Sequence, residues 1–246
     1  MQDQKGPHQR WLALWRELHG SFEDARITVR LLGSAGIALL CLERDFDPCQ
    51  VPLPRDIDII VRRKHAPRCS SILISHGATE LVGIVLASGG SRERYLLGGL
   101  QVDVFIDPFG MCHDIRLGAR LTWFRQTLCP GDLLITKAQN VALAERDCLH
   151  MAWLLKACPV VDPVGRYLEV ISATCGRHWG LWKTVEQNCQ YLKRTWARND
   201  GHDFSGLCAQ ADDLLSALSN CTKSWGWRLR SMLGCRMKWY REVEEV

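Results

Sequence analysis

Two aspartates one residue apart stand at the start of a strand-like apolar run. The run, DIDIIV at positions 56–61, alternates so that Asp56 and Asp58 share one face of a strand. Aspartate is a poor strand former, and like charges that share a face repel each other. The two carboxylates therefore need either solvent or a cation beside them.

A third aspartate occurs in a later segment that has the same alternation. In LQVDVFIDP, positions 100–108, apolar residues alternate with a set that includes Asp103. If the two strands lie side by side, Asp103 joins Asp56 and Asp58 on one patch. Such a cluster is unfavourable unless a divalent cation neutralises it, and carboxylate oxygens favour Mg²⁺ or Mn²⁺. Two such ions, held about 3.5–4 Å apart, activate a hydroxyl group and stabilise a departing pyrophosphate.

A Gly-Ser pair lies upstream of the acidic strand, between a predicted strand at 26–33 and a predicted helix at 34–45. Ser34 is the expected N-cap of that helix. Glycine at position 33 lets the backbone approach a phosphate closely, and the first helical turn offers unpaired N–H groups and the positive end of the dipole. Gly33 and Ser34 are therefore predicted to bind the phosphates of a nucleotide.

The remaining periodicities divide the chain into an α/β half and a helical half. Before residue 130, the further predicted elements are helices at 9–19 and 65–78, a proline-rich loop at 46–55, and a hairpin formed by 79–88 and 92–99. After Pro130, the segment 131–157 has helical periodicity, and so does the chain from Gly165 to Val246. We therefore predict domains at 1–130 and 131–246.

Composition is that of an ordinary globular chain. Of 246 residues, 47% are hydrophobic and 24% charged, and the net charge of +4 permits a polyanionic partner without requiring one. No apolar run approaches the about 20 residues that cross a bilayer. Arg16 and Glu17 interrupt the apolar residues of the N-terminal segment, so we expect no signal peptide there. The twelve cysteines are scattered singly, so we expect reduced, buried thiols in a cytoplasmic protein that does not enter a membrane.

The order of these parts resembles the nucleotidyltransferase superfamily related to DNA polymerase beta, in which a Gly-Ser turn precedes D-x-D and a later aspartate. Within it, the chain is most similar to the nucleotidyltransferase-like proteins grouped with the AbiEii/AbiGii toxins. The matching residues are Gly33, Ser34, Asp56, Asp58 and Asp103. A lysine followed by an Arg-Asp pair, in the segment after residue 130, resembles the helical block of that group. The resemblance covers about 26–246.

The resemblance implies an α+β protein with a nucleotidyltransferase-fold mixed sheet and flanking helices, followed by a C-terminal helical domain. It implies an enzyme that uses Mg²⁺ or Mn²⁺ to transfer NMP from an NTP to a hydroxyl acceptor, with release of pyrophosphate. Asp56 and Asp58 would bind both metals. Asp103 would be catalytic as well: it would complete the catalytic metal site and lower the pKa of the attacking hydroxyl group, alone or as general base. Lys137 would reach the triphosphate as a point charge, and Asp147 would orient that lysine.

The acceptor and the activity itself are open at this point. The toxin-like resemblance favours RNA, such as tRNA, or a protein as acceptor, with an antitoxin as partner; a small molecule is the alternative acceptor. A second hypothesis is a catalytically inactive module of the same fold that binds RNA or a partner protein. Related proteins often carry a further aspartate where this chain has His150. The tail from Lys223 to Arg241 mixes basic and aromatic residues and is a minority hypothesis for RNA binding, since helical tryptophans more often belong to the core.

Overall fold

The structure is a computed structural model that describes residues 8–81, 90–198 and 205–242. It contains two compact units. The first comprises the described residues up to Phe109 together with Arg116–Leu128, and the second comprises Gly110–Ile115 together with the described residues from Cys129 onward. The predicted boundary followed residue 130, and the sequence did not predict that Gly110–Ile115 joins the helices.

Several hydrogen bonds hold the segment Gly110–Ile115 to the rest of the second unit, and two of them involve its backbone. The backbone N–H of His113 donates to Gln139 Oε1 at 2.9 Å, and the N–H of Arg241 donates to the carbonyl of Cys112 at 3.0 Å. Both partners lie far along the chain, which explains why local periodicity did not reveal that this segment belongs to the second unit.

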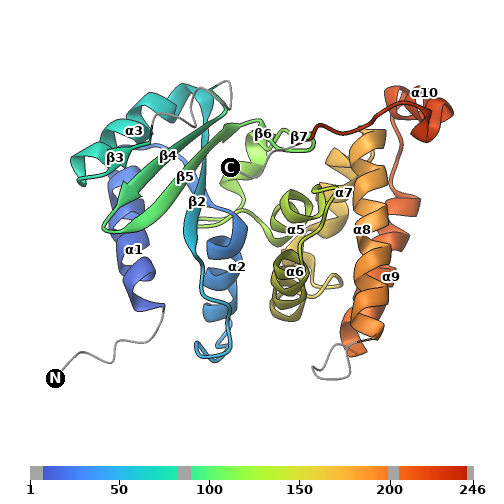
Figure 1. Cartoon of the computed structure of the whole chain (residues 1–246), viewed down its shortest axis with the longest axis horizontal. Coiled ribbons are helices and arrows are strands. Elements are labelled where there is room, and N and C mark those ends of the chain that lie inside the picture. The colour runs from blue at the N-terminus through green and yellow to red at the C-terminus, as the bar shows by residue number, and fades with distance from the viewer. Residues whose placement is uncertain (1–7, 82–89, 199–204, 243–246) are drawn as a thin grey trace. The chain divides into compact units, whose positions relative to one another are not determined.

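The first unit is built on a mixed sheet with the strand order β1-β2-β5-β4-β3 (Figure 1). The strands are β1 (Val29–Leu31), β2 (Asp56–Arg62), β3 (Thr79–Glu80), β4 (Arg92–Leu97) and β5 (Leu100–Asp107). β2 and β5 are parallel, and the other neighbours are antiparallel. The predicted α+β class with a mixed sheet and flanking helices is confirmed. β3 and β4 pair as the predicted hairpin requires, but residues 82–89 lie outside the described residues.

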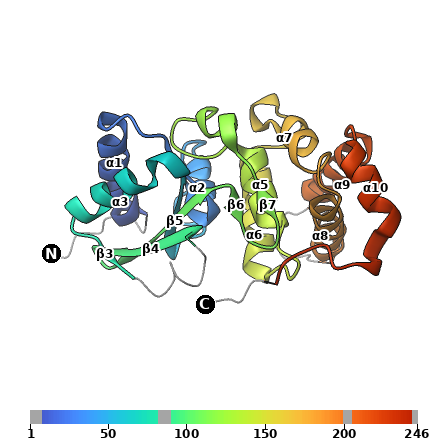
Figure 2. The same ribbon diagram turned by 90° about the horizontal axis from the view of Figure 1, so that it is seen from above.

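One face of the sheet is apolar and packs against helices. Its buried residues on the two central strands are Ile57, Ile59, Val61, Val102, Val104 and Ile106. Figure 2 shows α1 (Gln9–Asp24) and α3 (Ala66–Ser75) on the same side of strands β3 and β4. Trp15, Leu18 and Phe22 of α1 are buried there, so the apolar face of this helix belongs to the core.

α2 (Gly33–Leu42) follows β1 with a single residue between them. The prediction that Ser34 caps this helix is wrong, because the extended residue Leu32 is the N-cap and Ser34 lies inside the first turn. Gly33 begins the helix at a φ of +61°, a conformation that glycine adopts without steric cost. The strand is correspondingly shorter than the predicted 26–33.

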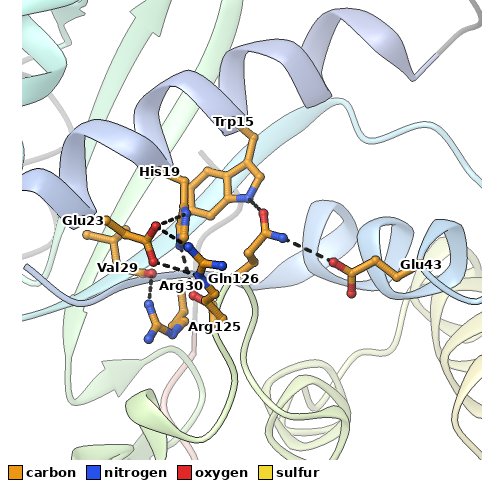
Figure 3. A network of polar contacts seen from close by, with 8 residues as sticks. All are labelled: Trp15, His19, Glu23, Val29, Arg30, Glu43, Arg125 and Gln126. Atoms are coloured by element: carbon orange, nitrogen blue, oxygen red, sulfur yellow. Dashed lines mark hydrogen bonds and ion pairs between the residues drawn. The ribbon is translucent and has the colours of Figure 1, made fainter.

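The outer edge of β1 is covered by the segment that leads to the second unit. Leu31 N–H donates to the carbonyl of Gln126 at 2.8 Å, and Leu128 N–H donates to the carbonyl of Leu31 at 2.9 Å. Side chains fix the same segment (Figure 3), since Trp15 Nε1 donates to Gln126 Oε1 at 3.2 Å. This edge of the sheet is therefore closed by backbone pairing.

The second unit is helical. Its helices within the described residues are α5 (Pro130–Ala138), α6 (Glu145–Ala157), α7 (Tyr167–Thr174), α8 (Trp179–Ala197), α9 (Ser205–Asn220) and α10 (Trp225–Leu233). The segment 131–157, which has helical periodicity, forms two helices and not one. Asn188 Nδ2 of α8 donates to the carbonyls of Ala138 and Asn140, at 2.8 and 2.7 Å. In a longer helix these carbonyls would accept hydrogen bonds from backbone N–H groups of the next turn.

Short 3-10 helices and a small two-stranded sheet of β6 (Phe109–Gly110) and β7 (Asp114–Ile115) complete the described elements. Among the helices of the described ranges, none combines the length and the apolar composition that spanning a membrane requires.

Candidate metal-binding site

The register of the central strands places charged residues in one row across the sheet. Asp58 of β2 lies opposite Asp103 of β5, and Arg94 of β4 lies opposite Asp103 on its other side. Residues paired in register point to the same face, so these three side chains are neighbours. Asp56 precedes Asp58 by two residues and shares this face. Two acids thus lie side by side, which is unfavourable without compensating positive charge.

The side chains of the three predicted aspartates converge on one site. Each of Asp56, Asp58 and Asp103 offers a carboxylate oxygen, and these oxygens all lie within 4.8 Å of one another. Asp56 and Asp58 are partly exposed, whereas the side chain of Asp103 is 0% exposed. Three carboxylate donors with access from solvent fit a hard divalent cation such as Mg²⁺ or Mn²⁺, and all of the donors come from the parallel strands β2 and β5.

Two arginines of β4 compensate the buried carboxylate. Arg94 Nε donates to Asp103 Oδ1 at 2.6 Å, and Arg92 Nη2 donates to Asp103 Oδ2. Gln101 Nε2 donates to Oδ2 at 3.1 Å. These charge-assisted bonds fix the orientation of the Asp103 carboxylate. Two guanidinium groups beside three carboxylates leave one net negative charge in the cluster, which favours a further cation.

Reasoning from the sequence missed Arg92 and Arg94. The two arginines alternate along a strand that directly precedes the strand of Asp103, and this pattern is the signal that could have found them. The guanidinium group of Arg92 also lies over the ring of Phe105, 4.9 Å from its centre, which holds the arginine on the face of the carboxylates.

Gly33 brings the start of α2 against the acidic strand. A Cβ atom at this position would lie 2.0 Å from Asp58 Oδ2, so any larger residue would displace the carboxylate. The N–H of Leu32 donates to the carbonyl of Asp58 at 3.0 Å and fixes the approach. The predicted Gly-Ser turn therefore does lie beside D-x-D, and the positive end of the α2 dipole is next to Asp58.

Ser34 lies behind this turn. It is only 3% exposed, and its Oγ has no hydrogen-bond partner among the described residues. Buried hydroxyl groups without a partner are uncommon because they lose their hydrogen bonds to water. A ligand oxygen or a water molecule at this turn would satisfy the hydroxyl group, which fits the predicted role of Ser34 at a phosphate.

Lys137 and Asp147 belong to the second unit, where they form an ion pair of 2.7 Å between Nζ and Oδ1. The predicted contact between the two residues is present, and its role at a triphosphate stays a prediction. His150, one turn further along α6, is 2% exposed. Burial, with the positive charges of Lys137 and Arg146, lowers the pKa of His150 to about 3. The histidine is therefore a neutral, packed side chain at physiological pH.

Most aromatic rings of the basic tail pack within the second unit. Trp227 meets Trp182 edge to face with ring centres 5.3 Å apart, and Trp239 meets Trp179 at 6.1 Å. Trp225, at 79% exposed, is the tail tryptophan that remains open to solvent. Within the described part of the tail, packing thus accounts for most of the aromatic residues that were candidates for stacking on bases.

Comparison with known proteins gives no family assignment for this chain. No protein-family model matches it, and no curated protein is significantly similar. The class of the site therefore rests on its own residues. These are an acidic triad from two parallel strands, an arginine pair that orients one member, and a glycine turn at the start of a helix.

Proposed function

We propose that the protein is a Mg²⁺-dependent nucleotidyltransferase that moves NMP from an NTP to a hydroxyl acceptor and releases pyrophosphate. One observation carries the proposal. Asp56, Asp58 and Asp103, from two separate strands, converge within 4.8 Å of one another. The Gly33 turn lies against the same carboxylates. Acidic clusters of this kind hold the cations that assist phosphoryl and nucleotidyl transfer.

Each residue of the cluster has a distinct part in this proposal. Asp56 and Asp58 are partly exposed and would hold the cation from the solvent side, and Asp103 would hold it from the buried side. When bound, Mg²⁺ supplies charge neutralisation at the phosphates and a lower pKa for the attacking hydroxyl group. Since Asp103 is buried, we assign it to cation binding and not to contact with the acceptor.

The turn at the start of α2 provides the phosphate-binding part. The absence of a side chain on Gly33 allows close approach, and the first turn of α2 has N–H groups without partners within the helix. The hydroxyl group of Ser34 would donate to a phosphate oxygen. RNA or protein as the acceptor, an antitoxin as partner, and Lys137 at the triphosphate stay predictions of the resemblance.

The direct test is incorporation of label from an NTP into total cellular RNA or protein in the presence of Mg²⁺. Nucleotidyl transfer incorporates label from the α-phosphate and none from the γ-phosphate. Asp56→Asn/Asp58→Asn is expected to abolish incorporation. Asp24→Asn/Asp45→Asn removes two exposed carboxylates of the same unit and is expected to leave incorporation unchanged. Incorporation that persists in the first variant, or γ-label that is transferred, would refute the proposal.

One observation favours the second hypothesis, a module without catalytic activity. The oxygens of Asp103 already accept hydrogen bonds from Arg92, Arg94 and Gln101, so this carboxylate contributes to sheet stability without any metal. That hypothesis predicts no consumption of nucleotide. It also predicts retention of RNA or of a partner protein that is independent of Mg²⁺.

A further inference from the structure

A cluster of cations lies at the carboxyl end of β2, in the first unit. It combines the last residue of β2, the 3-10 helix η1 (Arg63–His65), the start of α3 and the middle of β1. Its members, here called the basic edge, are Arg30, Arg62, Arg63, Lys64 and Arg68. Arg63, Lys64 and Arg68 are exposed, and Arg30 and Arg62 are partly exposed.

Backbone carbonyls, and not carboxylates, anchor the basic edge. Arg68 Nη2 donates to the carbonyl of Ala25 at 2.9 Å, and Arg62 Nη2 donates to that of Gly118 at 3.4 Å. Arg30 Nη1 donates to the carbonyl of Val29 at 2.7 Å. Among the described residues, no carboxylate forms an ion pair with any member of the basic edge. The guanidinium groups are therefore positioned without an ion pair, and the five positive charges outnumber the neighbouring carboxylates Glu23 and Asp107.

The nearest acids have other partners. Figure 3 shows Glu23 between Arg125 and His19, with a distance of 2.8 Å from Arg125 Nη2 to Glu23 Oε2. Asp107, the β5 partner of Arg62, accepts from the N–H groups of Leu117 and Gly118. The local field of the edge is thus positive.

One pKa shift agrees with this field. Burial lowers the pKa of His65, and the positive charges of Lys64, Arg62 and Arg68 lower it further. Burial also lowers the pKa of Arg30, where the charge of Glu23 opposes the shift more strongly than the charge of Arg62 adds to it.

We infer that the basic edge binds the phosphate backbone of a nucleic acid. Cations from four elements, none of them in an ion pair among the described residues, suit a polymer of phosphates better than a single anion. An anionic membrane surface would attract the same cations, so binding to vesicles is an outcome of the test below. Trp123 and Phe124, next to the anchored Arg125, are partly exposed and would stack on unpaired bases. This favours a single strand.

The basic edge and the acidic cluster lie on the same face of one strand. Arg62 follows Asp58 by four residues and Asp56 by six, so alternation turns all three side chains to the same side. At about 3.3 Å per residue, the two ends of β2 are about 20 Å apart. A nucleic-acid strand that is bound at the basic edge and extends over that distance would bring its terminal hydroxyl group to the carboxylates. This last step rests on the proposed function, whereas the binding itself does not.

The test is fluorescence anisotropy with labelled single-stranded RNA of mixed sequence, in EDTA and without NTP. Arg63→Glu/Lys64→Glu changes two exposed side chains that make no hydrogen bond within the described residues, so we expect a folded variant by circular dichroism. We expect a loss of affinity of about ten-fold or more and a weaker dependence on salt. Arg228→Glu/Arg236→Glu, with the same change of charge in the second unit, is the matched control and is expected to stay within about three-fold.

Three results would overturn the inference. These are wild-type affinity in Arg63→Glu/Lys64→Glu, loss of affinity in Arg228→Glu/Arg236→Glu instead, or binding to anionic vesicles but not to RNA. Duplex DNA and duplex RNA as parallel probes distinguish the form of nucleic acid. Asp56→Asn/Asp58→Asn is expected to bind RNA as well as the wild type does. The RNA-binding measurement can therefore be interpreted even if the protein shows no nucleotidyl transfer.

Discussion

The two units of the protein arrange their charges differently. The helical unit pairs opposite charges, as in Lys137 with Asp147 and Lys193 with Asp212. The sheet unit also contains ion pairs, such as Arg125 with Glu23, but in addition it gathers like charges, with three carboxylates at one end of β2 and five cations at the other. Paired charges are explained by folding alone. Clusters of like charge raise the free energy of the folded state, and we expect an external partner of opposite charge for each.

The buried arginine pair is the sharpest structural test of this difference. Arg94→Gln removes one of the two guanidinium groups from the fully buried Asp103 and should lower the free energy of unfolding by about 3 kcal/mol. Lys193→Gln, which breaks an exposed ion pair of the helical unit, should cost at most about 1 kcal/mol. Urea denaturation of both variants gives the comparison. Equal costs would show that the arginine does not compensate the acidic cluster.

A substitution at Gly33 tests whether stability depends on the close approach between β2 and the start of α2. Gly33→Ala places a methyl group 2.0 Å from Asp58 Oδ2 in a backbone conformation with φ of +61°. We expect a loss of about 2 kcal/mol in the free energy of unfolding. Gly20→Ala, in the interior of α1 with nothing within 4 Å of the added atom, should stabilise the protein by about 0.5–1 kcal/mol. A neutral Gly33→Ala would contradict the geometry at Asp58.

The smallest expected effect is the pH dependence of stability that comes from His150, in the helical unit. Its folded pKa of about 3 lies below its ordinary value of 6.5, so the fold favours the neutral form. The stability that this provides is complete above pH 6.5 and is lost as pH falls toward 3, with a loss of about 1.4 kcal/mol at pH 5.5. In His150→Leu this part of the acid sensitivity should disappear from thermal unfolding measured between pH 7 and 5.5. An unchanged pH profile would show that His150 is not buried as a neutral group.

The acidic residues of the site were predictable because strand alternation is a local signal. Asp56, Asp58 and Asp103 each stand in a segment of clear period two. Whether their carboxylates lie close together depends on the register of β2 and β5. Hydrogen bonds between segments that are distant in the sequence determine this register. The same dependence hid the arginines, since Arg94 faces Asp103 only when β4 pairs with β5 in the observed register.

Helix ends were harder to predict than helices. Asn188, fifty residues away, stabilises the break after Ala138, and the local signal is the weak one of Asn140 directly after the C-cap residue Gln139. At α2, Ser34 had the right type for an N-cap, but a left-handed Gly33 begins the helix one residue earlier. In both places tertiary contacts and backbone conformation overrode a local preference.

Binding of Mn²⁺ tests the central claim most directly, because it needs neither an acceptor nor a nucleotide. Electron paramagnetic resonance of free Mn²⁺ in a titration with protein should show saturable binding by the wild type and by Asp24→Asn/Asp45→Asn. It should show none by Asp56→Asn/Asp58→Asn when that variant remains folded. Equal binding by all three proteins, or none by the wild type, would contradict the assignment of the acidic cluster as a metal site.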